Sequence, residues 1–276
     1  MMLLAAVGFA FALTPEVEES ERLANAGDLE GVLKTLESYV ATHPDDAEAL
    51  WRLSRALYEK GEVLAQSVPD KERMPMYTRA QTLAHHAREI DPENGEGWLW
   101  EGVAMGRIAT ASGILSQLST ADDIEHLWMV ALSKKTKYRM ESGISSFPGD
   151  LYNALGQFYR LCPDWLAMKW ISGTRGDIDQ SVHYFRLMVA DDPGRLEAQK
   201  ELGVALLCKG YKQDDEAAKA EGRVWLKKAE ALPYSYPTDV IDHHQIPKIL
   251  ARESEACGYS RDGWEDTAES AYAGQK

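Results

Sequence analysis

One pattern recurs four times along the chain: a proline beside acidic residues, followed by apolar residues at every third or fourth position. Proline and acidic side chains suit the first turn of a helix, where backbone N–H groups lack partners and the helix dipole is positive. Alternation typical of strands is nearly absent. The chain is therefore predicted to be all-α, with helices starting in four equivalent segments. These segments are residues 43–61, 91–109, 147–162 and 192–210.

Each segment also carries a small residue near its middle, where a paired helix could approach closely. This arrangement resembles the tetratricopeptide repeat (TPR), a helix-turn-helix unit of 34 residues. The resemblance covers roughly residues 16–232 and implies a TPR-like α-solenoid of antiparallel helix pairs. The small residues are Ser54, Gly102, Gly156 and Gly203.

The spacing of the prolines departs from a regular array of 34-residue units. Pro44, Pro92, Pro148 and Pro193 follow one another at intervals of 48, 56 and 45 residues. The excess residues are predicted to form insertions that lie between paired helices or lengthen the second helix. The insertions are residues 61–76, 110–126 and 162–177.

The insertion CPDWLAMKWISGTRGD, residues 162–177, concentrates two tryptophans and other apolar residues before a Gly-rich turn. Its apolar spacing predicts a short helix with more apolar surface than free solvent tolerates. We expect Trp165 and Trp170 to be buried against the neighbouring repeat. The alternative is an exposed knob in which both tryptophans contact a protein partner or a membrane.

Four blocks of sequence narrow the resemblance: ALWRLSRALYEKGE, AREIDPENGEGWLWEGVAMGRIA, GILSQLSTADDIEHLW and QSVHYFRLMVADDPGRLEAQKELGVALLCKG. They resemble successive blocks of the regulator of microtubule dynamics family and its bacterial relatives. In that family too, an aromatic segment precedes a Tyr-Phe-containing helix that ends at Asp-Pro, here residues 183–193. The resemblance implies a helical-repeat module for protein interaction, with no enzymatic residues to transfer. Microtubule association is not carried over, because the leader-like start differs from the eukaryotic anchor and coiled coil.

The two ends of the chain differ from the repeats. The apolar run at residues 1–12 ends in a small-x-small pattern and resembles a signal peptide, although no basic residue precedes it. A helix over about residues 238–257 is predicted to cap the solenoid. The domain organisation is thus a signal peptide at 1–12, a TPR-like domain at 13–260 and a polar tail at 261–276. The tail is either disordered or docks a partner, with Trp264 as its only large anchor.

The three cysteines, Cys162, Cys208 and Cys257, have no CxxC spacing and no neighbouring histidine at ligand spacing. We expect buried, unpaired thiols, because a free cysteine behaves as a small apolar side chain. In an exported protein the alternative is one disulfide with one leftover thiol.

The balance of charges argues against nucleic acid as a partner. The chain has 30 basic and 44 acidic residues, a net charge of −14, whereas phosphate neutralisation requires a basic surface. No phosphate loop, HExxH, CxxC or GxSxG motif occurs. Adjacent histidines such as His243-His244 diverge by about 100° on a helix. We therefore predict no catalytic residue, no metal and no cofactor.

The groove of the solenoid is the predicted binding site. In TPR arrays the first helix of each pair lines the concave face, with its second, fifth, ninth and twelfth positions directed inward. We expect a protein or peptide partner there, because aromatic and arginine side chains anchor interfaces. The alternative is that these residues are core or paired with neighbouring glutamates. The predicted groove residues are Trp51, Arg55, Tyr58, Asn153, Gln157, Arg160 and Lys200.

These observations favour an exported, periplasmic, non-enzymatic scaffold that mediates protein-protein interaction, either alone or as a subunit of an envelope complex or oligomer. The alternative function is that of a TPR component associated with a TRAP-type transporter, which would bind a small apolar ligand in a central cavity. A cytoplasmic regulator is the third candidate if the leader is retained.

Overall fold

The computed structural model describes residues 13–65, 67–134, 145–165 and 168–265. The predicted signal peptide and the tail beyond residue 265 lie outside the described residues. Twelve α-helices account for most of the described chain. They are α1 (Pro15–Asn25), α2 (Leu29–Val40), α3 (Ala47–Val63), α4 (Asp70–Ile90), α5 (Gly95–Ala111), α6 (Ala121–Ser133), α7 (Phe147–Leu161), α8 (Met168–Ser172), α9 (Ile178–Asp191), α10 (Leu196–Gln213), α11 (Glu216–Glu230) and α12 (Asp239–Ala251).

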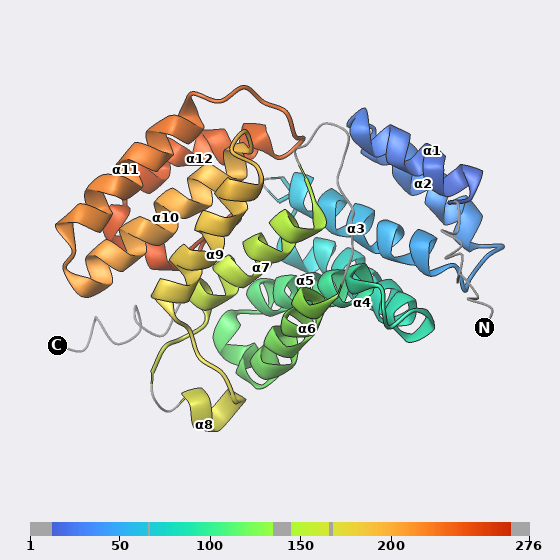
Figure 1. Ribbon diagram of the computed structural model, residues 1–276, viewed down its shortest axis with the longest axis horizontal. Helices are drawn as coiled ribbons and strands as arrows, with labels where there is room; N and C mark the ends of the chain where they lie inside the picture. The colour runs from blue at the N-terminus through green and yellow to red at the C-terminus, as the bar shows by residue number, and fades with distance from the viewer. Residues whose placement is uncertain (1–12, 66, 135–144, 166–167, 266–276) are drawn as a thin grey trace, which may run out of the picture.

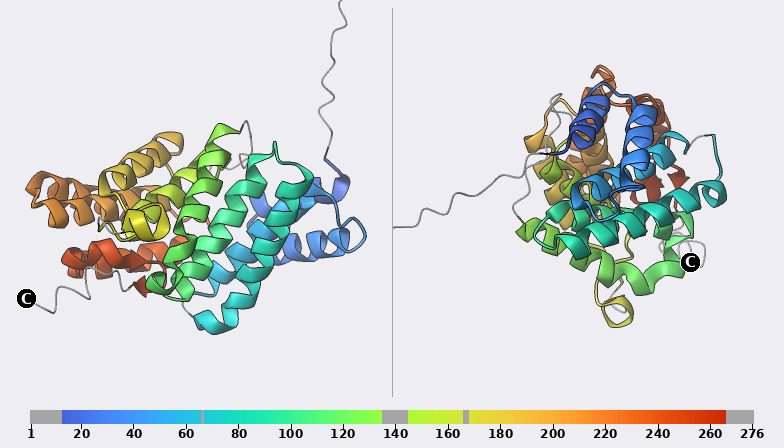
Figure 2. Two further views of the ribbon diagram at one scale, coloured as in Figure 1. Left: turned by 90° about the horizontal axis from the view of Figure 1, so that it is seen from below. Right: turned by 90° about the vertical axis from the view of Figure 1, so that its right-hand side faces the viewer.

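The helices are arranged in antiparallel pairs that follow one another across the molecule (Figures 1 and 2). The pairs are α1–α2, α3–α4, α5–α6, α7–α9 and α10–α11. The first helices of the last four pairs also touch in sequence, α3 with α5, α5 with α7 and α7 with α10, and so form one row. The prediction of an all-α, TPR-like solenoid is confirmed.

All four predicted segments form first helices of pairs. Three of these helices begin at a side chain that caps a free backbone N–H: Asp46 to Ala49, Asn94 to Glu96 and Ser146 to Gly149. Most of the recurring prolines lie in the turn before the helix; only the proline at 148 lies within a first turn.

The small residues lie where paired helices cross. A side-chain carbon added to Gly156 would meet the Phe185 ring at 2.7 Å, and one added to Gly102 would meet Trp128 at 2.5 Å. Ser54 donates to the Ala80 carbonyl of the paired helix at 2.8 Å. Close contact between the helices therefore explains the recurrence of small residues.

The insertions take the predicted places. The first lengthens the second helix, so that α4 has 21 residues. The second contains a 3-10 helix, η1 (Ile114–Thr120), and the third contains α8 between the paired helices α7 and α9. The expected burial of both tryptophans in the third insertion was wrong, however. Trp165 is half-buried against the Cys162 cluster, whereas Trp170 is 92% exposed because α8 extends away from the repeats (Figure 1).

The C-terminal capping helix is shorter than predicted. It ends at Ala251, because Arg252 leaves helical backbone geometry. A 3-10 helix, η2 (Glu253–Gly258), follows, and a hairpin joins β1 (Tyr259–Ser260) to β2 (Gly263–Trp264). The turn requires a glycine at 263, where φ is +143°.

Among the described residues, no helix has both the length and the apolar character needed to span a bilayer.

Candidate functional site

The concave face is crossed by the C-terminal segment, residues 253–265. Arg261 of this segment forms ion pairs with Glu62 of α3 at 3.1 Å and Glu197 of α10 at 2.7 Å. It also pairs with Asp242 of α12 at 3.1 Å. One arginine therefore connects the two ends of the row of first helices.

The next residue, Asp262, contacts positively charged side chains. It accepts from Arg73 of α4 at 2.9 Å and pairs with Arg107 of α5. Arg107 also pairs with Glu62 at 2.6 Å. Burial tends to raise the pKa of Glu62, but Arg107 and Arg261 outweigh it, so this pKa is lowered. The concave face thus carries an alternating network of buried charges.

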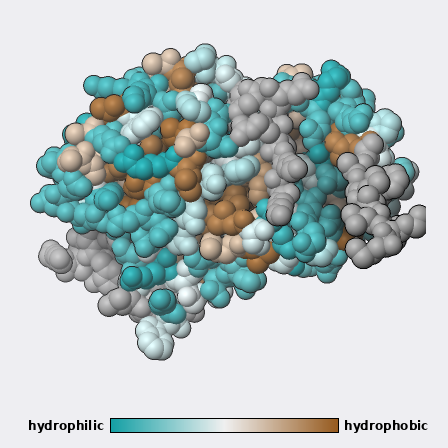
Figure 3. Space-filling view, viewed as in Figure 1, coloured by the Kyte–Doolittle hydropathy of each residue, from teal (hydrophilic) through white to brown (hydrophobic). Residues whose placement is uncertain are grey.

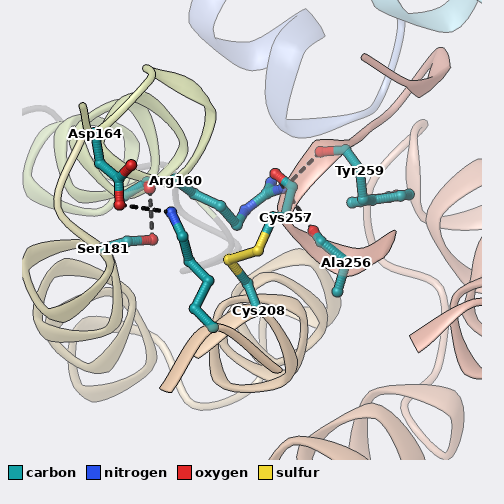
Figure 4. The surroundings of a disulfide bond; sticks show 9 residues. Arg160, Asp164, Ser181, Cys208, Ala256, Cys257 and Tyr259 are labelled. Carbon is teal, nitrogen blue, oxygen red and sulfur yellow. Dashed lines mark hydrogen bonds and ion pairs between the residues drawn. A yellow bond between two sulfur atoms is a disulfide. The ribbon is translucent and has the colours of Figure 1, made fainter. Parts of the chain in front are cut away.

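Tyr259 anchors the C-terminal segment on the concave face. It is buried, and its hydroxyl accepts from Lys200 at 3.0 Å and donates to Gln245. Arg160 donates to the Tyr259 carbonyl at 2.5 Å and to the Ala256 carbonyl at 3.3 Å (Figure 4). Arg160 and Lys200 are therefore occupied by the chain's own C-terminal segment.

A disulfide joins Cys208 of α10 to Cys257, two residues before Tyr259 (Figure 4). The expectation of three unpaired thiols was wrong for these two, because η2 packs directly on α10. Cys162 is free and buried, and burial raises the pKa of its thiol to about 12.

A cavity of about 170 Å³ opens beside this segment. It is lined by apolar side chains of α5, η1, α6 and α7 and by polar groups that include Ser260 and Arg261. One wall carries Trp100, whose buried indole N–H has no hydrogen-bond acceptor among the described residues. The apolar part is lined by Val103, Ile114, Leu118, Ile124, Phe158 and Leu161.

The predicted groove residues divide into two sets. Tyr58, Asn153 and Gln157 line the cavity. Asn153 donates to Glu197 at 3.0 Å, and Gln157 donates to Asn153 at 2.9 Å. These three side chains, from α3 and α7, lie at the same cavity.

The remaining groove residues are enclosed. Trp51 is 1% exposed in the main core, and Arg55 is buried against Glu59 and Tyr236. Lys200 is fully buried against Asp242 at 2.6 Å. Their expected open position was wrong, because the helical register fixes which way a side chain points but not what covers it.

Sequence reasoning missed the groups that close this face. Arg261 and Asp262 lie at the start of the predicted polar tail, and Arg73 and Arg107 lie outside the four inward positions expected of first helices. The adjacent opposite charges at 261 and 262 were the only available signal.

The sequence profile of the family "Regulator of microtubule dynamics protein 1-3" matches residues 17–141, which contain most of α1 and all of α2 to α6. No protein of curated function matches the sequence.

Two solved structures show the fold. The TPR protein TTC0263 of Thermus thermophilus is 14% identical, with a TM-score of 0.55 over 86% of this chain and 97% of that one. Human IFIT1, in a dimer with PPP-AAAA, is 12% identical, with a TM-score of 0.58 over 88% of this chain. This chain spans about half of IFIT1, 47% of its length. The chain is thus a TPR-like protein that resembles the regulator of microtubule dynamics family over residues 17–141.

Proposed function

We propose that the protein is a non-enzymatic scaffold that binds a protein partner through α8, with Trp170 as the central anchor. The proposal rests on the position of Trp170, which is 92% exposed on a helix outside the repeats. Tryptophan contributes a large apolar area when it becomes buried, and such side chains dominate interface energies. On the face of the molecule that Figure 3 shows, other apolar residues form patches surrounded by hydrophilic ones.

The base of the α8 insertion is fixed on the solenoid. The N–H of Gly176 donates to the Pro163 carbonyl, and the N–H of Asp177 donates to the Tyr159 carbonyl, both at 2.9 Å. Lys212 of α10 pairs with a further residue of the insertion at 2.9 Å. An anchor held in this way loses less conformational freedom on binding, which favours affinity.

Crosslinking and pull-down from the source cell test this proposal. We expect Trp170→Ala to weaken capture of the partner by about 30-fold, which corresponds to an anchor worth about 2 kcal/mol. Tyr234→Ala is the matched control, because Tyr234 is an aromatic residue with 52% exposure on another surface. A partner retained equally by both variants would contradict binding through α8.

The same proposal assigns the scaffold to the periplasm, as a subunit of an envelope complex. The disulfide between Cys208 and Cys257 supports export, because disulfides persist in oxidising compartments. Mass spectrometry of natively produced protein should find a mature N-terminus near Leu13. Retention of Met1 in cytosolic protein would instead favour a cytoplasmic regulator.

The second candidate function is binding of a small apolar ligand, in the manner of a TPR component associated with a TRAP-type transporter. The cavity supports it, since its volume of about 170 Å³ is similar to that of an apolar cavity that holds benzene, about 150 Å³. The apolar lining would contact the ligand, and the Trp100 N–H could donate to a polar atom on it.

Native mass spectrometry separates this candidate from the scaffold. A ligand-binding protein should carry a small molecule when purified, and Ala154→Phe should release it by filling the cavity. Trp170→Ala should leave the ligand in place. An empty wild-type protein that still captures its partner would eliminate the ligand and keep the scaffold.

A further inference from the structure

The C-terminal segment fits the concave face through three neighbouring subsites. An acidic subsite surrounds the Arg261 guanidinium, a basic subsite holds the Asp262 carboxylate, and a polar subsite binds the Tyr259 hydroxyl. The acidic subsite consists of Glu62, Glu197 and Asp242, the basic subsite of Arg73 and Arg107, and the polar subsite of Lys200 and Gln245.

We propose that these subsites form a peptide-recognition site for partner segments of the pattern Tyr-x-Arg-Asp, and that residues 259–262 occupy it as an internal mimic. The choice of partner follows from charge complementarity. Arginine matches carboxylates at more than one atom, and the Arg261 guanidinium contacts three of them. A lysine or an uncharged residue could not make this set of contacts.

The contacts that hold the segment can be transferred to another peptide. Among the described residues, no backbone-to-backbone hydrogen bond joins residues 259–265 to helices α1 to α11. The segment is held instead by side chains of the solenoid, which would meet the same groups on an incoming strand. Ser260 and Arg261 also line the cavity, so the segment borders open space at these two residues.

The disulfide controls the competition between the two occupants. Cys257 lies two residues before Tyr259, so its bond to Cys208 holds the mimic beside its subsites at high effective concentration. Reduction breaks this crosslink, while residues 259–262 stay joined to α12 through the chain and η2 still packs on α10. The site should therefore admit an external peptide more readily in the reduced protein.

A fluorescent peptide with the sequence GYSRDGWE, copied from residues 258–265, tests the site in the full-length chain. The control peptide GYSDRGWE exchanges the arginine and the aspartate while keeping composition and charge. We expect the first peptide to bind at least 10-fold more tightly than the control to the chain carrying Arg261→Ala and Asp262→Ala. We also expect it to bind that variant at least 10-fold more tightly than the oxidised wild type. Equal binding of both peptides, or no binding to a variant with unchanged helix content, would overturn the proposal.

If the variant loses helix content, the reduced wild-type chain provides the same test. Added GYSRDGWE should displace the mimic and increase hydrogen exchange at residues 259–265, whereas the control peptide should not. Failure of both readouts overturns the site. The inference rests on the proposed function only in that the chain binds proteins. Loss of peptide recognition with continued Trp170-dependent capture would therefore leave the scaffold proposal standing.

Discussion

Glu62 is the side chain on which the charges of the concave face converge. It lies buried between Arg107 and Arg261 and also accepts from Tyr77 at 3.0 Å. Breaking such a buried arrangement by removing one partner typically costs about 3–5 kcal/mol, because the remaining charges stay buried without compensation. Because Glu62 must stay ionised to keep these ion pairs, the attachment of the C-terminal segment to α3 is sensitive to pH.

The lowered pKa of Glu62 predicts loss of stability in acid. The folded pKa lies below the unfolded value of 4.5, so the stabilisation is fully present above about pH 4.5 and is lost as the pH falls through the folded pKa. A tenfold difference in proton affinity between the folded and unfolded states corresponds to about 1.4 kcal/mol. Denaturant unfolding between pH 6 and pH 3 should show a shallower decline for Glu62→Gln than for the wild type.

Glu255→Gln is the control for this measurement, because the Glu255 side chain is 49% exposed and pairs with Arg252 at the surface. It should follow the wild-type pH dependence. Identical pH dependence in Glu62→Gln and the wild type would show that the buried network does not govern acid stability.

Cys162 should be unreactive in the folded protein. Burial hinders access to the thiol and raises its pKa to about 12, so almost no thiolate exists near pH 8. Iodoacetamide should leave the native protein unmodified, as read by intact mass. After unfolding without reductant, one cysteine should be alkylated; three alkylated cysteines would mean that Cys208 and Cys257 are not joined.

At the level of helix pairs, two glycines provide a matched comparison. A methyl group at Gly156 of α7 would lie 2.7 Å from the Phe185 ring, whereas one at Gly106 of α5 would lie 3.5 Å from Trp128. Alanine in a helix interior gains up to about 1 kcal/mol over glycine, but overpacking costs about 1–3 kcal/mol. Gly156→Ala should therefore lower the unfolding free energy, and Gly106→Ala should leave it unchanged or raise it. Equal effects in denaturant unfolding would mean that α9 moves away without cost.

The helices could be predicted from sequence because their signals are local. The recurring prolines, the caps and the small residues at 54, 102, 156 and 203 all report on one helix and its immediate pair. The exposure of Trp170 was not predictable from the sequence. A helix of only five residues, such as α8, has the same apolar spacing whether its apolar side chains face a neighbour or point away from it. The hairpin at 259–264 lacks the length that makes strand alternation visible.

Across the whole molecule, the candidate site was only half predictable. Helical register identified Tyr58, Asn153 and Gln157 as inward-facing residues. It could not reveal that Arg261 returns to α3, because 199 residues separate it from Glu62 and no periodicity connects them. Long-range closure of this kind depends on the path of the chain after α12, which the repeat pattern does not encode.

The disulfide allows the coupling between the two ends of the solenoid to be tested. Cys208 and Cys257 are 49 residues apart, and a crosslink over that distance contributes about 4 kcal/mol in the chain-entropy account. Replacing both cysteines with serine should lower the unfolding free energy by up to that amount, measured without reductant. Wild-type protein in excess reductant is the control and should show the same midpoint.

The helices that lose protection from hydrogen exchange should distinguish this chain from an ordinary repeat protein. In a simple solenoid each unit contacts only its neighbours, so loosening η2 would affect hydrogen exchange in α7 and in α10 to α12 alone. Here Arg261 and Asp262 carry ion pairs from the C-terminal segment to α3, α4 and α5. Exchange should therefore also accelerate at the C-terminal end of α3 in the double serine variant. Acceleration confined to α7 and to α10 to α12 would mean that the ion pairs add no coupling beyond that of adjacent repeats.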